Sequence, residues 1–198
     1  MRKLTIEELG RPSVSEYRER RKLPIVVLLD NVRSLHNVGS AFRTCYAFGM
    51  ERLVLTGITG HPPHREINKT ALGATESVTW EHNADAAGAV KELKDAGYRI
   101  VVVEQTTESV PLHALEIRPD LKYCLVFGNE VHGVGEEVIA HADMAIEVPQ
   151  AGTKHSLNIS VCLGVVCWEF FKMHIRYTGL IRTFAQNFTN SARRVRSV

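Results

Sequence analysis

The sequence lacks the features that would mark a membrane or secreted protein. Its most apolar segment, residues 159–171, is shorter than the roughly 20 residues that a membrane-spanning helix needs. Its N-terminus is charged and has no apolar stretch of the kind found in signal peptides. The four cysteines lie in apolar runs without Cys-x-x-Cys spacing, which favours free buried thiols over disulfides or zinc ligands; they are Cys45, Cys124, Cys162 and Cys167. These absences predict a cytoplasmic protein that does not enter a membrane.

Several common catalytic and nucleotide-binding motifs are also missing. No Gly-x-Gly-x-x-Gly occurs, and the glycine-rich stretch 128–135 lacks the Gly-Lys-Ser/Thr ending of a phosphate-binding loop. No serine lies in a Gly-x-Ser-x-Gly setting, so hydrolase chemistry has no support. His61 and His64 have a spacing found among metal ligands, but two prolines separate them and no third ligand is near in the sequence. We therefore expect no metal site.

The chain does have an ordinary globular composition with an uneven distribution of charge. Its 198 residues, 44% hydrophobic and 23% charged, suit one domain with a substantial core. The net charge of +2 hides two basic ends: residues 1–22 carry seven Lys/Arg and four Glu, and residues 170–198 carry six Lys/Arg and no acid. The remaining residues, 23–169, carry 11 Lys/Arg and 18 Asp/Glu. Basic ends on an acidic body are compatible with binding a polyanion, although charged, solvated termini are common in proteins of every function.

Strand-like and helix-like segments alternate along the chain. The run from Pro24 to Leu29 is continuously apolar and rich in β-branched residues, as in a strand buried on both faces. Gly49 and Gly97 each follow a helix-like segment, and residues 57–65 form a loop with two glycines and two prolines. We expect strands at 24–29, 52–55, 78–80, 98–103, 123–127 and 144–148, and helices at 37–48, 69–75, 84–96, 136–141 and 157–177. This order predicts an α/β fold with a largely parallel sheet.

The last expected helix, residues 157–177, is apolar on every side. Its apolar residues from Leu157 to Met173 spread around the circumference and do not form a single stripe. A helix of this kind must be covered on more than one side. Two interpretations remain open: a central core helix, or a helix with the sheet on one side and a partner subunit on the other.

Three short motifs lie at expected strand–loop–helix junctions. They are Asn37-Val38-Gly39-Ser40-Ala41-Phe42-Arg43, then Phe127-Gly128-Asn129-Glu130-Val131-His132-Gly133, then Val148-Pro149-Gln150-Ala151-Gly152 followed by Ser156-Leu157-Asn158-Ile159-Ser160-Val161. In this order, over roughly residues 25–177, they resemble the motifs of the TrmH/SpoU family, RNA ribose 2′-O-methyltransferases of the SPOUT superfamily. The resemblance implies a Rossmann-like SPOUT fold with a deep C-terminal trefoil knot. It also implies a homodimer whose interface includes the last helix, and S-adenosyl-L-methionine as cofactor.

The resemblance assigns cofactor binding to residues of the second and third motifs. Gly128, Asn129, Val148 and Leu157 would bind the cofactor, mainly through backbone atoms. A glycine at the end of a strand lets the backbone approach a ligand closely, although a simple turn glycine looks the same in a sequence. Glu130 would help to organise the site. Gln150 stands where the family often has methionine, and we expect it to alter the pocket wall without abolishing binding.

The resemblance assigns catalysis to Asn37, Arg43, Glu130, Ser156 and Asn158. Ser156 is also well placed to cap the last helix. Arginine is a poor proton acceptor because guanidinium stays protonated in nearly all protein settings. We therefore favour a role for Arg43 in binding a target phosphate and stabilising the alkoxide that forms, with a role as base left open.

RNA contacts are expected in the loop 57–65, at Lys69 and Arg43, and in the tail at Arg193 and Arg194. We divide the chain into a basic extension (1–22), a SPOUT methyltransferase domain (23–177) and a basic tail (178–198). The extension is too short for the separate RNA-binding domain of many family members, which favours tRNA slightly over ribosomal RNA as substrate. The alternatives are a non-catalytic RNA-binding protein that keeps the fold, and a nucleotide-binding regulatory domain, which the missing phosphate loop disfavours.

Overall fold

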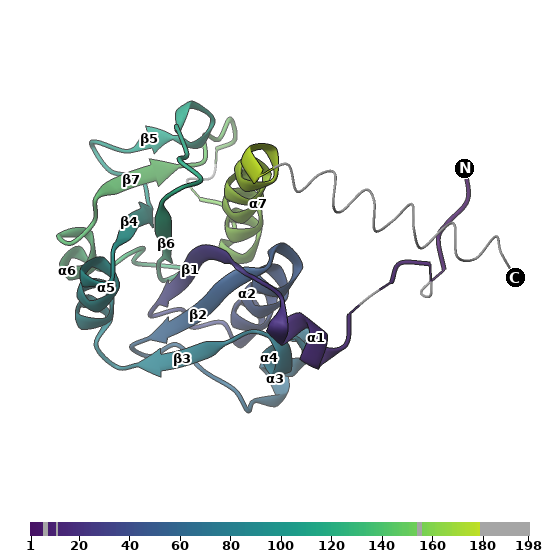
Figure 1. Cartoon of the computed structure of the whole chain (residues 1–198). Helices are drawn as coiled ribbons and strands as arrows, with labels where there is room; N and C mark the ends of the chain where they lie inside the picture. The colour runs from purple at the N-terminus through teal and green to yellow at the C-terminus, as the bar shows by residue number, and fades with distance from the viewer. Residues whose placement is uncertain (6–7, 11, 154–155, 179–198) are drawn as a thin grey trace, which may run out of the picture.

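The computed structural model describes residues 1–5, 8–10, 12–153 and 156–178. It contains one sheet that is covered by helices on both faces (Figure 1). The helices are α1 (Val14–Glu19), α2 (Leu35–Phe48), α3 (Arg65–Ala71), α4 (Ala74–Ser77), α5 (Ala86–Asp95), α6 (Glu136–Ile139) and α7 (Ile159–Thr178), with a 3-10 turn at Leu112–Ala114. The strands are β1 (Leu23–Asp30), β2 (Met50–Thr56), β3 (Trp80–Asn83), β4 (Tyr98–Val103), β5 (Val110–Pro111), β6 (Lys122–Phe127) and β7 (Met144–Glu147).

The sheet is parallel throughout, with its strands in the order β3-β2-β1-β6-β4-β7-β5. The central strand β1 is buried on both faces. Ile25, Val27 and Leu29 pack in the cluster that contains α2 and α7, whereas Val26 and Leu28 pack in the cluster that contains α5 and α6. Because both faces of β1 are covered, its sequence is continuously apolar, as expected for a parallel sheet. The predicted α/β fold with a parallel sheet is confirmed.

The structure corrects the expected boundaries of several elements. The expected helix at 69–75 is two helices, α3 and α4, because Leu72 and Gly73 have left-handed φ values of 47° and 83° that end α3. The strand expected at 78–80 is β3, which begins only at Trp80. Helix α2 begins two residues earlier than expected, because Ser34 caps it by accepting a hydrogen bond from the Asn37 N–H at 3.3 Å.

The N-terminal extension contains a helix that the sequence analysis did not predict. Ser13 and Glu16 form a reciprocal capping box at the start of α1. Tyr17 is buried and stacks on Tyr46 of α2 with ring centroids 4.3 Å apart, and its hydroxyl donates to the Tyr46 carbonyl at 3.0 Å. These contacts hold α1 against the end of α2. The short strand β5 was also missed.

Helix α7 is covered on one side only. Leu163, Val166, Cys167 and Phe170 are buried against the sheet and α2, whereas apolar residues on the other side are exposed. The interpretation of α7 as a central core helix is therefore wrong for the single chain. Among the described helices, none is long and apolar enough to cross a membrane.

Candidate active site

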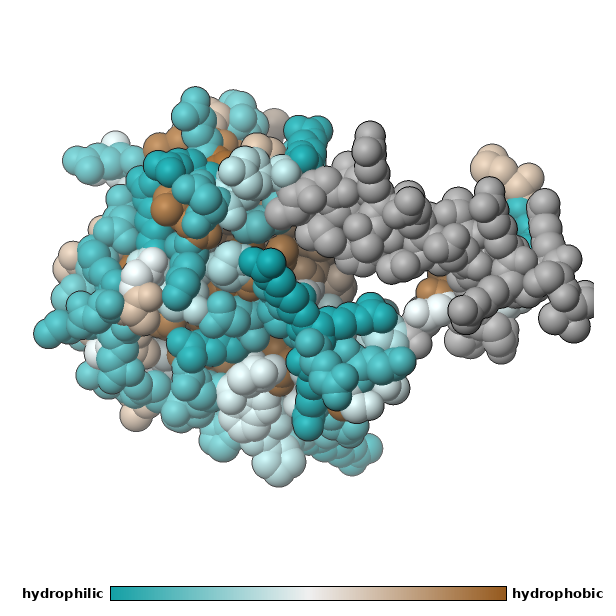
Figure 2. All heavy atoms as spheres, in the orientation of Figure 1, coloured by the Kyte–Doolittle hydropathy of each residue, from teal (hydrophilic) through white to brown (hydrophobic). Residues whose placement is uncertain are grey.

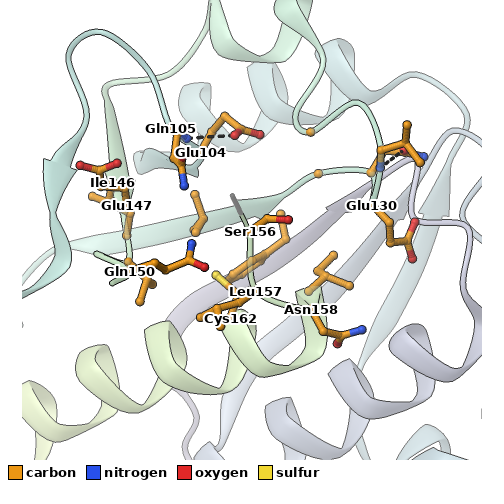
Figure 3. Close-up of a pocket in the computed structure, with 18 residues that line it drawn as sticks. Glu104, Gln105, Glu130, Ile146, Glu147, Gln150, Ser156, Leu157, Asn158 and Cys162 are labelled. Carbon is orange, nitrogen blue, oxygen red and sulfur yellow. Dashed lines mark hydrogen bonds between the residues drawn. The ribbon is translucent and has the colours of Figure 1, made fainter. Parts of the chain in front are cut away.

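A cavity of about 350 Å³ lies at the carboxyl ends of β4, β6 and β7 (Figure 3). Open parallel sheets bind ligands at this edge. The cavity brings together residues from the second and third motifs that are up to 32 positions apart in the sequence, from Phe127 to Ile159. Its lining includes all four predicted cofactor-binding residues and three of the predicted catalytic ones: Gly128, Asn129, Val148, Leu157, Glu130, Ser156 and Asn158.

The loop that follows β6, residues 128–135, folds back on itself at Gly128. A Cβ placed on Gly128 would lie 2.1 Å from the Gly133 carbonyl carbon and 2.1 Å from the Val134 nitrogen. Asn129 and Gly133 exchange two backbone hydrogen bonds, at 2.8 and 3.0 Å, that close this return. The backbone therefore requires glycine at 128 because the loop itself occupies the space, which corrects our expectation that the glycine leaves room for a ligand.

The side chain of Asn129 stabilises the same loop. Its amide nitrogen donates to the Asn31 carbonyl at 2.7 Å, and its amide oxygen accepts from the N–H groups of Val131 and His132 at 2.8 and 3.1 Å. All the polar atoms of this amide thus bond to backbone groups of the protein. Asn129 lines the cavity mainly as a structural residue of the loop.

Glu130 joins this loop to the start of α2. Its carboxylate accepts hydrogen bonds from the N–H groups of Arg33 and Ser34, both at 3.0 Å, and from the Asn37 side-chain amide at 2.9 Å. Partial burial opposes ionisation, but the bonds from Arg33, Asn37 and Ser34 outweigh it and hold the pKa of Glu130 below its usual range. Glu130 therefore carries a stable negative charge near the N-terminus of α2, a favourable location for an anion.

Asn158 caps α7, and it also touches the first motif. Its side-chain oxygen accepts from the Ser160 N–H at 2.9 Å, and its backbone carbonyl accepts from Val161 and Cys162. Its amide nitrogen lies 3.4 Å from the side-chain oxygen of Asn37. The capping residue is thus Asn158, and the prediction that Ser156 caps the helix is wrong. Ser156 precedes the helix and lines the cavity.

Arg43 lies away from this group of residues. It is exposed on α2 and lines a second cavity of about 680 Å³ between α1, α2, α4 and α7. The described residues of this second cavity include four cationic side chains and one carboxylate, at Arg20, Arg21, Lys22, Arg43 and Glu76. Figure 2 shows strongly hydrophilic residues gathered over α1 and the loop that leads to β1. The first motif therefore splits: Asn37 bonds to Glu130 and Asn158, which line the first cavity, whereas Arg43 lines the second.

The predicted RNA-contact loop packs against the start of α2. His64 caps α3 through its ring nitrogen, which lies 3.1 Å from the Glu66 N–H. Glu66 in turn pairs with Lys69 at 2.7 Å and with His36 of α2 at 3.0 Å, which keeps the pKa of Glu66 below its usual value. Lys69 is half exposed on this surface. Two other predicted RNA contacts, Arg193 and Arg194, lie outside the described residues.

The histidine pair and the cysteines have structural positions. His61 contacts the Pro62 carbonyl, at 3.0 Å from its ring nitrogen. Cys45, Cys124 and Cys167 are buried free thiols, and burial raises the pKa of Cys45 and of Cys124 to about 12. Within the described part of the chain, no group of three or more His, Cys, Asp or Glu side chains is arranged to hold a metal ion.

Two carboxylates missed by the sequence analysis fix the 128–135 loop. Asp30, buried at the end of β1, accepts from the Gly135 N–H at 2.8 Å. Glu104, just after β4, accepts from the Val134 N–H at 3.1 Å. Asp30 is the last residue of the apolar strand β1, and Glu104 directly follows the apolar strand β4; that position was the one available signal for them.

Similarity to known proteins agrees with this arrangement. The model of the SpoU rRNA methylase family matches residues 24–168. A tRNA (guanosine(18)-2′-O)-methyltransferase of Thermus thermophilus is 30% identical over 169 residues, which cover 85% of each chain. The enzyme of the same name from Aquifex aeolicus is 32% identical over 156 residues, which cover 78% of this chain and 72% of the relative.

Solved structures with the same fold include members of this family. The TrmH/SpoU tRNA-modifying enzyme of Aquifex aeolicus superimposes with a TM-score of 0.72 and 26% identity, covering 95% of this chain and 96% of that one. An AdoMet-bound rRNA methyltransferase from Sinorhizobium meliloti superimposes with a TM-score of 0.71 and 25% identity, covering 79% of this chain and 60% of that one. The second and third motifs line one cavity, and the family model matches residues 24–168, so this chain belongs to the SpoU rRNA methylase family.

Proposed function

We propose that this protein is an S-adenosyl-L-methionine-dependent methyltransferase that acts on a ribose 2′-hydroxyl of structured RNA. The observation that carries the proposal is the convergence of the second and third motifs, which come from the ends of β6 and β7, on one cavity. The Thermus relative, matched over 85% of its length, is named as a tRNA 2′-O-methyltransferase, and a Neisseria meningitidis relative, matched over 57% of its length, is named as a 23S rRNA 2′-O-methyltransferase. The Thermus and Aquifex relatives are named for guanosine 18 of tRNA. Their names favour tRNA slightly over rRNA as the substrate of this protein.

The residues of the first cavity fit S-adenosylmethionine. Its volume of about 350 Å³ lies in the range of small-molecule sites. Apolar side chains suited to a nucleoside, including Val103, Phe127, Ile146 and Val148, line it together with amides and hydroxyls. When bound, the cofactor supplies a methyl group attached to a positively charged sulfur. Gly128, Asn129, Val148 and Leu157 would hold it, as the resemblance implies.

The chain's own residues position the reacting hydroxyl. Glu130 fixes Asn37, and Asn37 in turn meets Asn158, so the three side chains form one connected group at the start of two helices. Both carboxylate oxygens of Glu130 and the side-chain oxygen of Asn37 accept hydrogen bonds. These bonds restrict the rotation of the two side chains. This group and Ser156 would orient the ribose. Holding reactants in one geometry supplies much of the rate enhancement in group transfer.

We propose that the active site is completed by a second copy of the chain. Arg43 does not line the first cavity, although the resemblance gives it a catalytic role. Val161, Val165 and Trp168 form an exposed apolar stripe on α7 with exposures of 53%, 40% and 48%. Residues four and seven positions apart lie on one helix face, and an apolar stripe of this kind favours burial against a partner. In a homodimer, Arg43 of one subunit would act at the first cavity of the other.

RNA capture would rest on basic residues outside the first cavity. The four cations of the second cavity, together with Lys69, support binding to phosphates. The division into a basic extension (1–22), a domain (23–177) and a tail (178–198) remains a proposal, and so does a cytoplasmic location. Deletion of 182–198 would weaken RNA binding and reduce its salt dependence while sparing cofactor binding. Equal loss of cofactor affinity would show instead that the tail is structural.

We also propose the deep trefoil knot typical of the SPOUT fold. Residues 128–135 and Asn158 both return to the first half of the chain, where they bond to Asp30, Asn31 and Asn37. This return of the chain supports a knot. A crystal structure that traces residues 128–178 continuously tests it, and an unthreaded path would refute it.

Measurements of cofactor binding, of RNA binding and of methyl transfer separate this function from a non-catalytic RNA-binding protein. Calorimetry of the RNA-free protein with S-adenosylhomocysteine should show binding in the micromolar range. Incubation with S-adenosylmethionine and tRNA or rRNA transcripts should then produce 2′-O-methylated nucleotides. A folded protein that binds RNA but neither binds the cofactor nor transfers methyl groups would support the non-catalytic alternative.

A further inference from the structure

Glu104 holds a defined position beside the first cavity. One oxygen of its carboxylate accepts from the Gln105 N–H at 2.9 Å, and the other accepts from the Val134 N–H at 3.1 Å. Gly133 has a left-handed φ of 69°, and a Cβ there would lie 2.2 Å from the carboxylate oxygen. The loop thus passes directly over the carboxylate. Figure 3 shows Glu104 across the cavity from α7, where Cys162 lies.

The charge of Glu104 is not neutralised by the groups that hold it. Both of its donors are uncharged backbone N–H groups, and among the described residues no Lys or Arg forms an ion pair with it. Burial and, to a smaller extent, the negative charge of Glu104 together raise the pKa of the Cys162 thiol to about 11. The influence of this carboxylate therefore extends across the cavity to α7.

The described lining of the first cavity is negative. Its described lining residues include three carboxylates, on Glu104, Glu130 and Glu147, and no Lys, Arg or His. Of these, Glu130 bonds to three donors at the N-terminus of α2, whose dipole offsets its charge. The carboxylate of Glu104 has no such helix terminus beside it, since its donors belong to a loop and a strand end.

We propose that Glu104 determines which form of the cofactor the cavity prefers: its carboxylate favours the positively charged sulfonium of S-adenosylmethionine over the neutral thioether of S-adenosylhomocysteine. This inference rests on the proposed function. The two ligands share the same adenosine and amino-acid groups, and they differ by one methyl group and one positive charge. A negative charge in a partly desolvated cavity stabilises the charged ligand selectively. Glu104 would thereby help the product to leave after each transfer.

The test measures both ligands on both proteins by calorimetry. Glu104→Gln keeps the size of the side chain and one oxygen acceptor but removes the charge. We expect the substitution to lower the affinity for S-adenosylmethionine by about tenfold, which is the scale of one charge–charge contact in a partly solvated site. The affinity for S-adenosylhomocysteine should fall by less than about threefold. Glu108→Gln is the matched control, because Glu108 is exposed four positions away and does not line the cavity. This control should change neither affinity.

The outcomes are distinguishable. Equal weakening of both ligands would show that Glu104 only supports the loop, and it would overturn the proposal, as would no change in either. A wild-type protein that is folded yet binds neither ligand would instead refute the proposed function. If Glu104→Gln does not fold, the wild-type protein still decides: raising the salt concentration should weaken S-adenosylmethionine more than S-adenosylhomocysteine, because salt screens the charge contact. An identical salt response would overturn the proposal.

Discussion

Replacing Gly128 by alanine should damage the cofactor cavity through the loop that forms it. The added methyl group would start 2.1 Å from two backbone atoms of Gly133 and Val134, whereas ordinary contacts begin near 3.4 Å. The loop must therefore move by roughly 1.3 Å, which is the difference between these distances. A movement of that size would stretch the Asn129–Gly133 hydrogen bonds, now 2.8 and 3.0 Å, and the Val134–Glu104 bond, now 3.1 Å, beyond hydrogen-bonding range.

The magnitude follows from these losses. Overpacking of a tight site costs about 1–3 kcal/mol, and each lost hydrogen bond costs roughly 0.5–1.5 kcal/mol. Partial relaxation of the loop would leave a net destabilisation of about 2–4 kcal/mol, which corresponds to a fall of roughly 5–15 °C in Tm. Because the same loop lines the cavity, cofactor affinity should fall by at least about tenfold, or roughly 1.4 kcal/mol.

Thermal unfolding and calorimetry with S-adenosylhomocysteine measure the two effects. The control is Gly164→Ala in α7, where the added methyl group meets nothing within 4 Å and alanine favours the helix. This control should keep cofactor affinity and should not lower Tm. Wild-type Tm and affinity in Gly128→Ala would refute the reasoning, because the loop would then tolerate a side chain that the structure excludes.

Three further predictions concern Arg43, the α7 stripe and Glu130. Arg43→Ala should lower the rate of methyl transfer by about 10²–10³-fold and leave the cofactor affinity unchanged. Arg43→Lys should also be impaired, because lysine cannot make a bidentate contact with phosphate. Near wild-type turnover of Arg43→Ala would disprove the role of Arg43. Val165→Glu should convert a dimer to the 22.2 kDa monomer in sedimentation, and an already monomeric wild type would refute the dimer. The pKa of Glu130 is lowered on folding, so its contribution to stability should be complete above its ordinary value near 4.5 and lost as the pH falls through the lower folded value. The difference in unfolding free energy between wild type and Glu130→Gln should therefore be constant above about pH 4.5 and shrink below it, and a difference that grew in acid would contradict this assignment.

The sequence predicted the elements whose patterns are strong and local. The continuous apolar run predicted the buried strand β1, and the glycine after α2 predicted where that helix ends. The start of α7 was misplaced because Ser156 and Asn158 are both good capping residues, and only the tertiary contact with Asn37 selects Asn158. Helix α1 was missed because its six residues carry little periodicity, and its position depends on the packing of Tyr17 against Tyr46.

The site was predictable as a set of motifs but not as an arrangement. The family resemblance predicted that Gly128, Val148 and Leu157 share one site, and all three line the first cavity. The reason for Gly128 depends on the return of a loop five residues later, which no pattern indicates. Glu104 belongs to no motif, since its role arises only when the end of β4 meets the loop after β6.

Mapping of 2′-O-methyl groups across tRNA and rRNA tests the central claim most directly. Cells that lack this protein would be compared with cells that regain either the wild-type protein or Arg43→Ala. We predict that at least one 2′-O-methylated nucleotide disappears without the protein, returns with the wild type and stays absent with Arg43→Ala. An unchanged methylation map in tRNA and rRNA, with the protein expressed and folded in the wild-type cells, would contradict the proposed methyltransferase activity.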